Sequence, residues 1–257
     1  MIAFLARIAG WFADPAHWQG SDGVPMRLFE HVWYSLFAVL AAVAIALPIG
    51  LLVGHTNRGG EIAVNIASLG RAIPSFGLLV LAFALAGFGY GPVWVVLTVL
   101  AFPSIVTNSF IGIRSVDPEV RESASAMGMT GWQVLSKVEV PIAVPLIMAG
   151  IRTAAVQIVA TTTLAAFIAE GGLGRYIFDG LPQGRYEEVV AGALLVAALA
   201  LLTEFGLGRL QRAIVPHGLR RQAESAALDA KIAMDRSLSV DSARLVGRAG
   251  QGGRGGG

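Results

Sequence analysis

The sequence has no cysteine and few charged side chains: aspartate, glutamate, lysine and arginine make up 14% of its 257 residues. Without cysteine the chain can form no disulfide, no thiolate nucleophile and no cysteine-ligated metal site. A soluble domain usually carries about 25% charged residues, whereas here hydrophobic residues reach 55% and the mean hydropathy is +0.67. These values exclude a soluble enzyme, a secreted disulfide-stabilised domain and a disordered protein, and they indicate a polytopic membrane protein.

Long stretches with almost no charge predict the transmembrane segments. Between residues 32 and 113 only Arg58, Glu61 and Arg71 are charged. A helix needs about 20 apolar residues to cross a bilayer, and five apolar runs reach this length, at roughly 32–54, 62–87, 93–113, 146–169 and 188–207. Because the runs are continuously apolar and not alternating, they favour helices over barrel strands. The sequence therefore predicts an all-α, polytopic membrane helical bundle with five core helices, or six if the apolar N-terminal residues add another.

Three segments are expected from the distribution of these runs. Residues 1–31 form an N-terminal interfacial segment, 32–207 form the transmembrane domain, and 208–257, rich in alanine, serine, arginine and glycine, form a tail that is expected to be disordered. Within the second run, Pro74 removes a backbone donor and should kink the helix or split it into two pieces.

The basic residues predict the orientation in the cell membrane, because loops rich in lysine and arginine stay on the cytoplasmic side. An N-terminus outside and a C-terminus inside place three basic groups on one side: the 55–61 turn, the 114–145 segment and the chain after the last run. The segment 114–145 is then the main cytoplasmic loop. The basic pI near 9.3 follows from this arrangement and does not indicate nucleic-acid binding.

The predicted cytoplasmic loop contains two short helices joined by a glycine turn. Asp117-Pro118 is typical of an N-cap followed by proline in the first turn, and Pro141 is expected to stop the second helix. Between them the sequence reads Glu122-x-Ala124, three residues, Gly128, nine residues and then Val138-x-Val140-Pro141. This spacing resembles the EAA loop of binding-protein-dependent ABC importer permeases, Glu-Ala-Ala-x3-Gly-x9-Ile-x-Leu-Pro, with Ser123 in place of the first alanine.

Other segments are similar to the glycine betaine/choline/carnitine (osmoprotectant) subfamily of these permeases. They include Gly150-Ile-Arg-Thr-Ala-Ala-Val-Gln157, Thr163-Leu-Ala-Ala-Phe-Ile168 and Gly171-Gly-Leu-Gly174. The similarity covers about residues 10–207, and Arg71 departs from the neutral polar residue expected there.

The resemblance implies a transmembrane permease subunit of an ATP-driven importer for osmoprotectants, with the loop as its coupling element. Its partners would be two copies of a cytoplasmic ABC ATPase subunit, a second permease chain, identical or homologous, and an extracytoplasmic substrate-binding protein. The coupling residues would be Glu122, Ala124, Gly128, Val138 and Pro141. The sequence has no Gly-x4-Gly-Lys-Ser/Thr loop to bind ATP phosphates, so ATP would be hydrolysed by the partner, and no cofactor or metal is expected in this chain.

Two alternative functions remain open at this point. An ABC permease for an amino acid such as methionine would use the same loop. A secondary carrier driven by an ion gradient would need no ATPase, but such carriers usually show two related halves, and no internal repeat is visible in this sequence. High affinity for a quaternary ammonium usually needs an aromatic cage, and the spans show no aromatic cluster, so recognition is expected in the binding protein.

Polar residues inside the predicted spans are candidates for a translocation path, because polar groups in a bilayer usually face a cavity or the bundle interior. Arg71 lies about 15 Å along the helix from Glu61, near mid-bilayer. For each residue, hydrogen bonding between helices is an equally weighted alternative. The candidates are Asn65, Ser68, Arg71, Ser75, Ser104, Asn108, Gln157 and Thr161.

Overall fold

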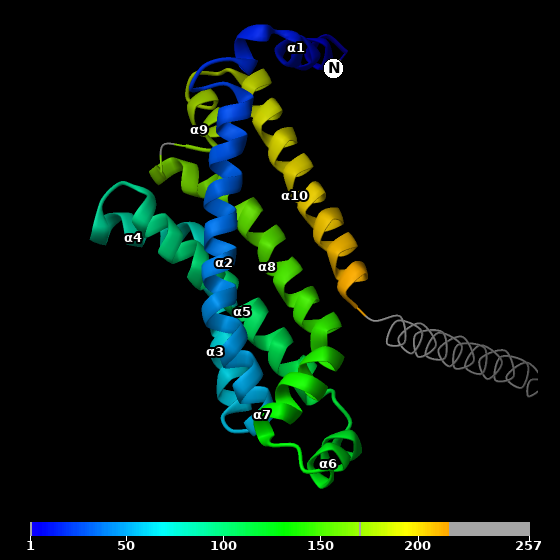
Figure 1. Ribbon diagram of the computed structural model, residues 1–257. Helices are drawn as coiled ribbons and strands as arrows, with labels where there is room; N and C mark the ends of the chain where they lie inside the picture. The colour runs from blue at the N-terminus through cyan, green and yellow to red at the C-terminus, as the bar shows by residue number, and fades with distance from the viewer. Residues whose placement is uncertain (1, 170, 216–257) are drawn as a thin grey trace, which may run out of the picture. The chain divides into compact units, whose positions relative to one another are not determined.

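The computed structural model describes residues 2–169 and 171–215, without the side chains of residues 61, 63, 66, 67, 69, 71 and 169. The described residues form helices and contain no strand (Figure 1). Residues 1–212 form one compact unit, and the predicted tail at 208–257 lies almost entirely outside the described residues. The helices are α1 (Ile2–Ala13), α2 (Val24–Thr56), α3 (Gly60–Ala72), α4 (Ser75–Ala86), α5 (Tyr90–Arg114), α6 (Pro118–Ala126), α7 (Gly131–Val134), α8 (Val140–Ala169), α9 (Arg175–Gly180) and α10 (Tyr186–Ile214), with a 3-10 turn η1 (Pro15–Trp18) and a π-helical turn η2 (Leu135–Glu139).

Within the described residues, four helices are long and apolar enough to cross a membrane: α2, α5, a continuous helix over Gly131–Ile168, and α10. The second predicted run is instead divided into α3 and α4, and the split is one of the two outcomes predicted for Pro74. Ile73 and Pro74 both have extended backbone, with ψ values of 126° and 116°. Proline disfavours helical backbone in the residue before it and lacks an N–H, which explains the break at this point.

The expectation that Pro141 stops a helix is wrong. The helix passes through α7, η2 and α8 without interruption, from Gly131 to Ile168. In a regular α-helix the proline ring would clash with the preceding turn. Here the wider π turn of η2 comes directly before α8, which gives the ring room. The transmembrane helix therefore begins inside the predicted loop, well before residue 146.

The tightest packing in the bundle is between α2 and α5. Every fourth residue of α2 from 38 to 54 is alanine or glycine and is buried, so one face of the helix has no bulky side chain. A Cβ added to Gly50 would lie 2.7 Å from Ser109 Cβ, and one added to Gly54 would lie 2.7 Å from Ile113 Cβ. Small residues let membrane helices approach this closely, and van der Waals contact then stabilises the pair.

The other side of α5 packs against α8 in the same way. A Cβ on Gly150 of α8 would lie 2.5 Å from Asn108 Cβ and 2.9 Å from the Ser104 carbonyl oxygen. Gly112 of α5 approaches Ala143 Cβ to 3.3 Å by the same measure. Helix α5 is therefore held between two long helices and is the centre of the bundle.

Helix α10 is the least enclosed of the four long helices. An apolar cavity of about 600 Å³ separates it from α2 and α8, lined by side chains such as Val39, Val159 and Leu207. Polar contacts hold the C-terminal half of α10 to α8. Arg152 Nε lies 3.4 Å from Glu204 Oε1, and the side-chain amide of Gln211 donates to the Pro145 carbonyl of α8 at 3.0 Å.

The close packing predicts the effect of enlarging Gly150. We expect Gly150→Val to lower the free energy of unfolding by about 1–3 kcal/mol, because the added methyl groups overpack the contact with α5. Thermal unfolding of the purified protein in detergent measures this as a lower Tm. Gly206→Val in α10 is the matched control, since a Cβ at Gly206 meets nothing within 4 Å; equal destabilisation by the two changes would contradict the packing argument.

Candidate functional site

The segment predicted to couple the protein to an ATPase is fully structured. Asp117 caps α6, its Oδ1 accepting the Glu119 N–H at 2.9 Å, with Pro118 in the first turn. The helix ends at Ala126, and the chain turns at Gly128, whose φ of +85° lies in the left-handed region, where only glycine is free of steric cost. The predicted capped helix and glycine turn are therefore both present.

The next helix begins with a second cap. Gln133 N–H donates to Thr130 Oγ1 at 3.4 Å, and Thr130 N–H donates to Gln133 Oε1 at 2.8 Å, which together make a capping box. Since both short helices have fixed starting points, the loop is a defined shape and can act as a rigid element.

The five residues of the motif have different environments. Glu122, Gly128 and Pro141 are exposed, Val138 is half-buried and Ala124 is buried. Ala124 and Val138 lie close together, because both line a hollow of about 380 Å³ between α6 and η2, together with Asp117, Glu119, Val120, Ser123, Met127 and Met129. The structure thus brings Ala124 and Val138 together, while Glu122 points to solvent.

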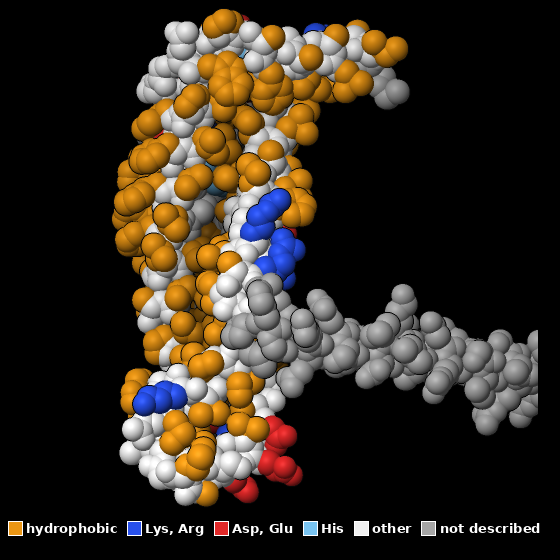
Figure 2. All heavy atoms as spheres, turned by 45° about the vertical axis from the view of Figure 1, so that its right-hand side comes forward, with side chains coloured by type: hydrophobic (Ala, Val, Ile, Leu, Met, Phe, Trp, Pro, Cys, Tyr) orange, Lys and Arg blue, Asp and Glu red, His pale blue; other side chains and the backbone are white. Residues whose placement is uncertain are grey.

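The outer surface of this loop exposes large apolar and acidic side chains beside two basic ones, Arg114 and Lys137. Met127 is 77% exposed and Trp132 is 71% exposed, and Glu119 and Glu122 are also exposed. Figure 2 shows acidic side chains gathered at the end of the molecule that carries α6. Exposed large apolar side chains with a charged rim are typical of a protein-binding surface.

Three side chains from distant parts of the chain meet behind this surface. Glu139, the last residue of η2, is 1% exposed. Its Oε2 lies 2.7 Å from Nδ1 of His55, at the end of α2, and its Oε1 lies 3.2 Å from Nε of Arg121 in α6. Arg121 also donates to the backbone carbonyl of Ile113 at the end of α5. We refer to these three residues as the Arg121–Glu139–His55 cluster.

Sequence patterns alone do not reveal this cluster. Arg121 is one of the basic residues of the 114–145 segment, and Glu139 occupies an unspecified position of the motif, between Val138 and Val140. A signal does exist, because Glu139 is an acid between apolar positions at the start of a membrane helix. Its partner His55 is 84 residues away, and the pairing depends on how α2 packs against α5.

The candidate path residues are distributed over α3, α4, α5 and α8 and do not all meet. Ser104 and Thr161 are buried. The Thr161 hydroxyl donates to the Gln157 carbonyl within its own helix at 2.8 Å. The Asn108 side-chain amide donates to the Ser104 carbonyl, also within one helix, at 2.8 Å. Asn65 is exposed and lines a cavity of about 310 Å³ with Phe110. Ser68 is exposed, Ser75 and Gln157 are half-buried, and the Arg71 side chain lies outside the described residues.

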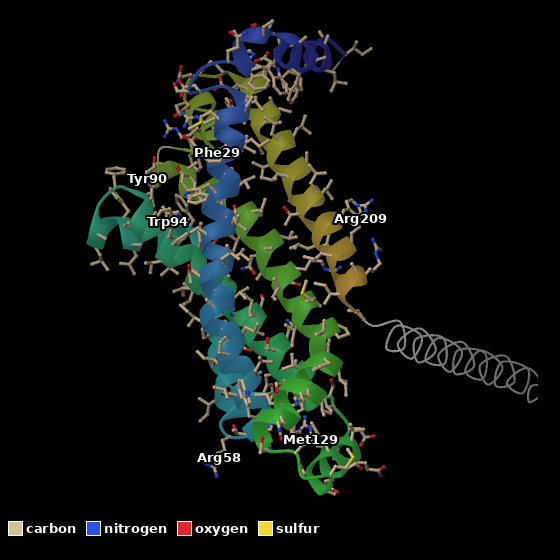
Figure 3. All side chains as sticks on the ribbon, in the orientation of Figure 1. Phe29, Arg58, Tyr90, Trp94, Met129 and Arg209 are labelled. Atoms are coloured by element: carbon tan, nitrogen blue, oxygen red, sulfur yellow. The ribbon has the colours of Figure 1, made fainter. Side chains whose placement is uncertain are left out.

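Aromatic rings from α2 and α5 form a cluster that the sequence analysis did not expect. The ring centroids of Phe37 and Trp94 are 4.4 Å apart, and those of Tyr34 and Tyr90 are 5.1 Å apart. Tyr90 and Trp94 lie on the first turns of α5 (Figure 3). The paired residues are far apart in the sequence, because one of each pair lies on α2 and the other on α5, so the cluster is visible only in the fold.

The loop after α8 is fastened to α2 at the opposite end of the bundle from α6. The N–H of Gly172 donates to Glu30 Oε2 at 2.8 Å, and the Leu173 N–H donates to His31 Nδ1 at 3.3 Å. Because His31 Nδ1 accepts, its Nε2 carries the proton, and this N–H donates to the Val159 carbonyl at 2.9 Å. His31 is therefore a neutral, fully buried link between α2, α8 and the loop.

Tyr176 of α9 adds a further contact to this end. Its hydroxyl donates to the Asp22 backbone carbonyl at 2.7 Å, and its ring packs edge-on against Trp11 at 5.4 Å. Burial raises the pKa of Tyr176 to about 12, so the hydroxyl keeps its proton and remains a donor at physiological pH. Among the described residues, no group of three or more His, Asp or Glu side chains could hold a metal ion.

The hydrogen bonds of His31 predict how this end responds to substitution. His31→Leu should lower the free energy of unfolding by about 1–3 kcal/mol, since the buried Leu173 N–H loses its acceptor. His31→Gln keeps one donor and one acceptor and should cost less. Thermal unfolding in detergent compares the two variants, and a leucine variant as stable as the glutamine variant would contradict the assigned bonds.

Comparisons with known proteins match this chain to transport permeases, the class of protein that the loop motif indicates. The family model described as "Binding-protein-dependent transport system inner membrane component" matches residues 46–217. The carnitine transport permease protein OpuCB of Listeria monocytogenes is 37% identical over 199 residues, which cover 77% of this chain and 91% of the relative. The choline transport system permease protein OpuBB of Bacillus subtilis is 35% identical over 198 residues, covering 77% and 91%.

A solved structure shows the same fold. An inward-facing form of the MetNI methionine ABC transporter matches with a TM-score of 0.63 and 24% identity, covering 74% of this chain and 95% of that chain. The family match spans more than half of the sequence and includes the capped loop, the central helix α5 and the long helix that follows. The chain belongs to the inner-membrane permease family of binding-protein-dependent ABC importers.

Proposed function

We propose that this permease imports compact quaternary ammonium osmoprotectants, such as glycine betaine, choline or carnitine, with energy from a separate ATPase subunit. The observation that carries the coupling part of the proposal is the capped, outward-facing helix α6 with its exposed apolar and acidic side chains. The substrate class is supported by the relatives, whose names include carnitine, choline and glycine betaine transport permeases.

The coupling loop would work as a rigid contact between the ATPase and the membrane helices. Met127 and the exposed acids would seat α6 in a groove of the ATPase, with Glu122 in a hydrogen bond or ion pair at its edge. Gly128 would permit the sharp return of the chain, while Ala124, Val138 and Pro141 would join α6 to the start of α8. As the ATPase subunits close on ATP, α6 would follow the groove.

The orientation proposed for the chain agrees with this role. Arg58, in the turn between α2 and α3, and Met129 of the loop lie at the same end of the molecule (Figure 3). With this end on the cytoplasmic side, the basic turn and loop obey the positive-inside rule. The N-terminal helix α1 and the loop fastened by His31 would then face outward.

The working transporter would contain two permease chains, two ATPase chains and an external substrate-binding protein. The polar residues on α3, α4, α5 and α8, from Asn65 and Ser68 through Arg71 and Ser75 to Ser104, Asn108, Gln157 and Thr161, would line a weakly binding path. The aromatic rings near Trp94 contact one another directly, so high-affinity recognition is assigned to the binding protein.

Two other functions have weaker support. The methionine transporter shares the fold at 24% identity, which does not extend to its substrate, whereas relatives of higher identity carry names of osmoprotectant systems. A secondary carrier driven by an ion gradient would have no use for a docking helix on its cytoplasmic face.

Substitution of Gly128 tests the ATPase contact. Gly128→Val forces a β-branched residue into backbone with φ +85°, at a cost of about 1–3 kcal/mol of strain, and should displace α6. We expect the variant to lose the ATPase subunit when the complex is purified through a tag on the permease. Gly184→Val carries similar strain at φ +68° in the loop before α10 and should retain the ATPase; retention by both variants would contradict the proposal.

Uptake measurements test the substrate class. In proteoliposomes that contain the permease with its ATPase and binding protein, labelled glycine betaine, choline or carnitine should accumulate only when ATP is supplied. Labelled methionine measures the alternative in the same vesicles. Accumulation of methionine without any of the three quaternary ammonium compounds would refute the substrate assignment and leave the ATPase contact unaffected.

A further inference from the structure

We infer that the Arg121–Glu139–His55 cluster is a joint that makes α6 move together with the transmembrane helices, with Glu139 as its positioning residue. The inference rests on the proposed function, since it explains how movement received by the coupling loop would pass into the membrane.

Each member of the cluster belongs to a different structural element. His55 lies in the last turn of α2, Arg121 lies in the middle of α6, and Glu139 ends η2 where α8 begins. Both carboxylate oxygens of Glu139 are used, one by His55 and one by Arg121. The hydrogen bond from Arg121 to the Ile113 carbonyl adds the end of α5. The Glu139 carboxylate and the Arg121 guanidinium together therefore connect the coupling helix to α2, α5 and α8.

The burial of Glu139 makes these connections hard to break one at a time. Its side chain is 1% exposed and that of Arg121 is 17% exposed. A charge removed from water costs several kcal/mol unless it keeps its partner. If α6 moved alone, Arg121 would leave a buried carboxylate with less compensation. Displacement of α6 is therefore favoured only when the start of α8 moves with it.

The local helix geometry explains why a joint is needed at this position. Within this continuous helix, the π turn over Leu135–Glu139 replaces the regular α-helical hydrogen-bond pattern between α7 and α8, and such turns often occur at functional sites. The backbone thus links the loop to α8 through this π turn. The hydrogen bond of Glu139 with His55 and its ion pair with Arg121, at the end of the π turn, stiffen that link.

The joint and the docking surface are separate faces of α6. Arg121 is the one basic residue of α6 and it is directed inward to Glu139, whereas Glu119 and Glu122 remain exposed on the other side. Substitutions in the joint can therefore change the transfer of movement without removing the side chains that would contact the ATPase.

The test uses the complete transporter, the permease with its ATPase and binding protein, in proteoliposomes supplied with glycine betaine and ATP. Glu139→Gln removes the charge and keeps the shape. Arg121→Met/Glu139→Gln removes both buried charges, so it should fold even if the single variant does not, because neutral replacement of a buried ion pair is often neutral for stability. We expect both variants to retain the ATPase and hydrolyse ATP, while the substrate moved per ATP falls about tenfold.

A purely structural role predicts a different result. The double variant would then recover both stability and the wild-type ratio of substrate to ATP, and that recovery would overturn the inference. His55→Gln removes only the α2 arm and should reduce the ratio less than Glu139→Gln; a wild-type ratio in this variant and in the double variant would also overturn it. Arg58→Met, which removes an exposed cation from the turn after α2, is the control expected to leave the ratio unchanged.

The same experiment separates failure of the joint from failure of the proposed function. If the wild-type permease neither retains the ATPase nor transports substrate, the coupling proposal itself is wrong. If the wild type does both and the joint variants keep a wild-type ratio, only the inference about the cluster is wrong.

Discussion

The close approach of α2 and α8 to α5 is the constraint on which the other features of this permease depend. A bilayer offers no hydrophobic driving force between helices, so contact at short range must hold them together. Gly50, Gly54 and Gly150 allow this contact because they lack the Cβ that would overlap the facing helix. Three long helices packed at this distance form a stiff unit, and a stiff unit can carry a displacement from one side of the membrane to the other.

Both ends of this unit are fastened by buried polar contacts. At the α6 end these contacts centre on the buried carboxylate of Glu139, which pairs with His55 and Arg121. At the opposite end His31 accepts from one backbone N–H and donates to a carbonyl, and the Glu30 carboxylate accepts from the Gly172 N–H and pairs with Arg27. Charged groups therefore take part at both ends, and the α6 end is the one that lies beside the surface proposed to contact the ATPase.

Sequence reasoning identified those features that depend on neighbours along the chain. The cap at Asp117, the glycine turn at Gly128 and the break at Pro74 follow from local backbone chemistry, and the apolar runs follow from the length of a bilayer. It failed at Pro141, because a π turn that accommodates a proline has no distinct local pattern. It also missed the pairing of His55 with Glu139 and the aromatic cluster around Trp94, since both depend on the packing of distant helices. The role of the path residues stays a prediction, because their function depends on what moves past them.

The most direct test of the account is whether α6 and the start of α8 move as one body. The chain has no native cysteine, so Ser125→Cys and Ser136→Cys, both at exposed positions, place one spin label on α6 and one on η2. Pulsed electron resonance then measures their separation in transporters where labelled permease is diluted with unlabelled chains. The account predicts the same narrow distance distribution with and without ATP while transport proceeds. A shift or a broadening of that distribution on ATP binding would show that α6 moves independently, and would contradict the account.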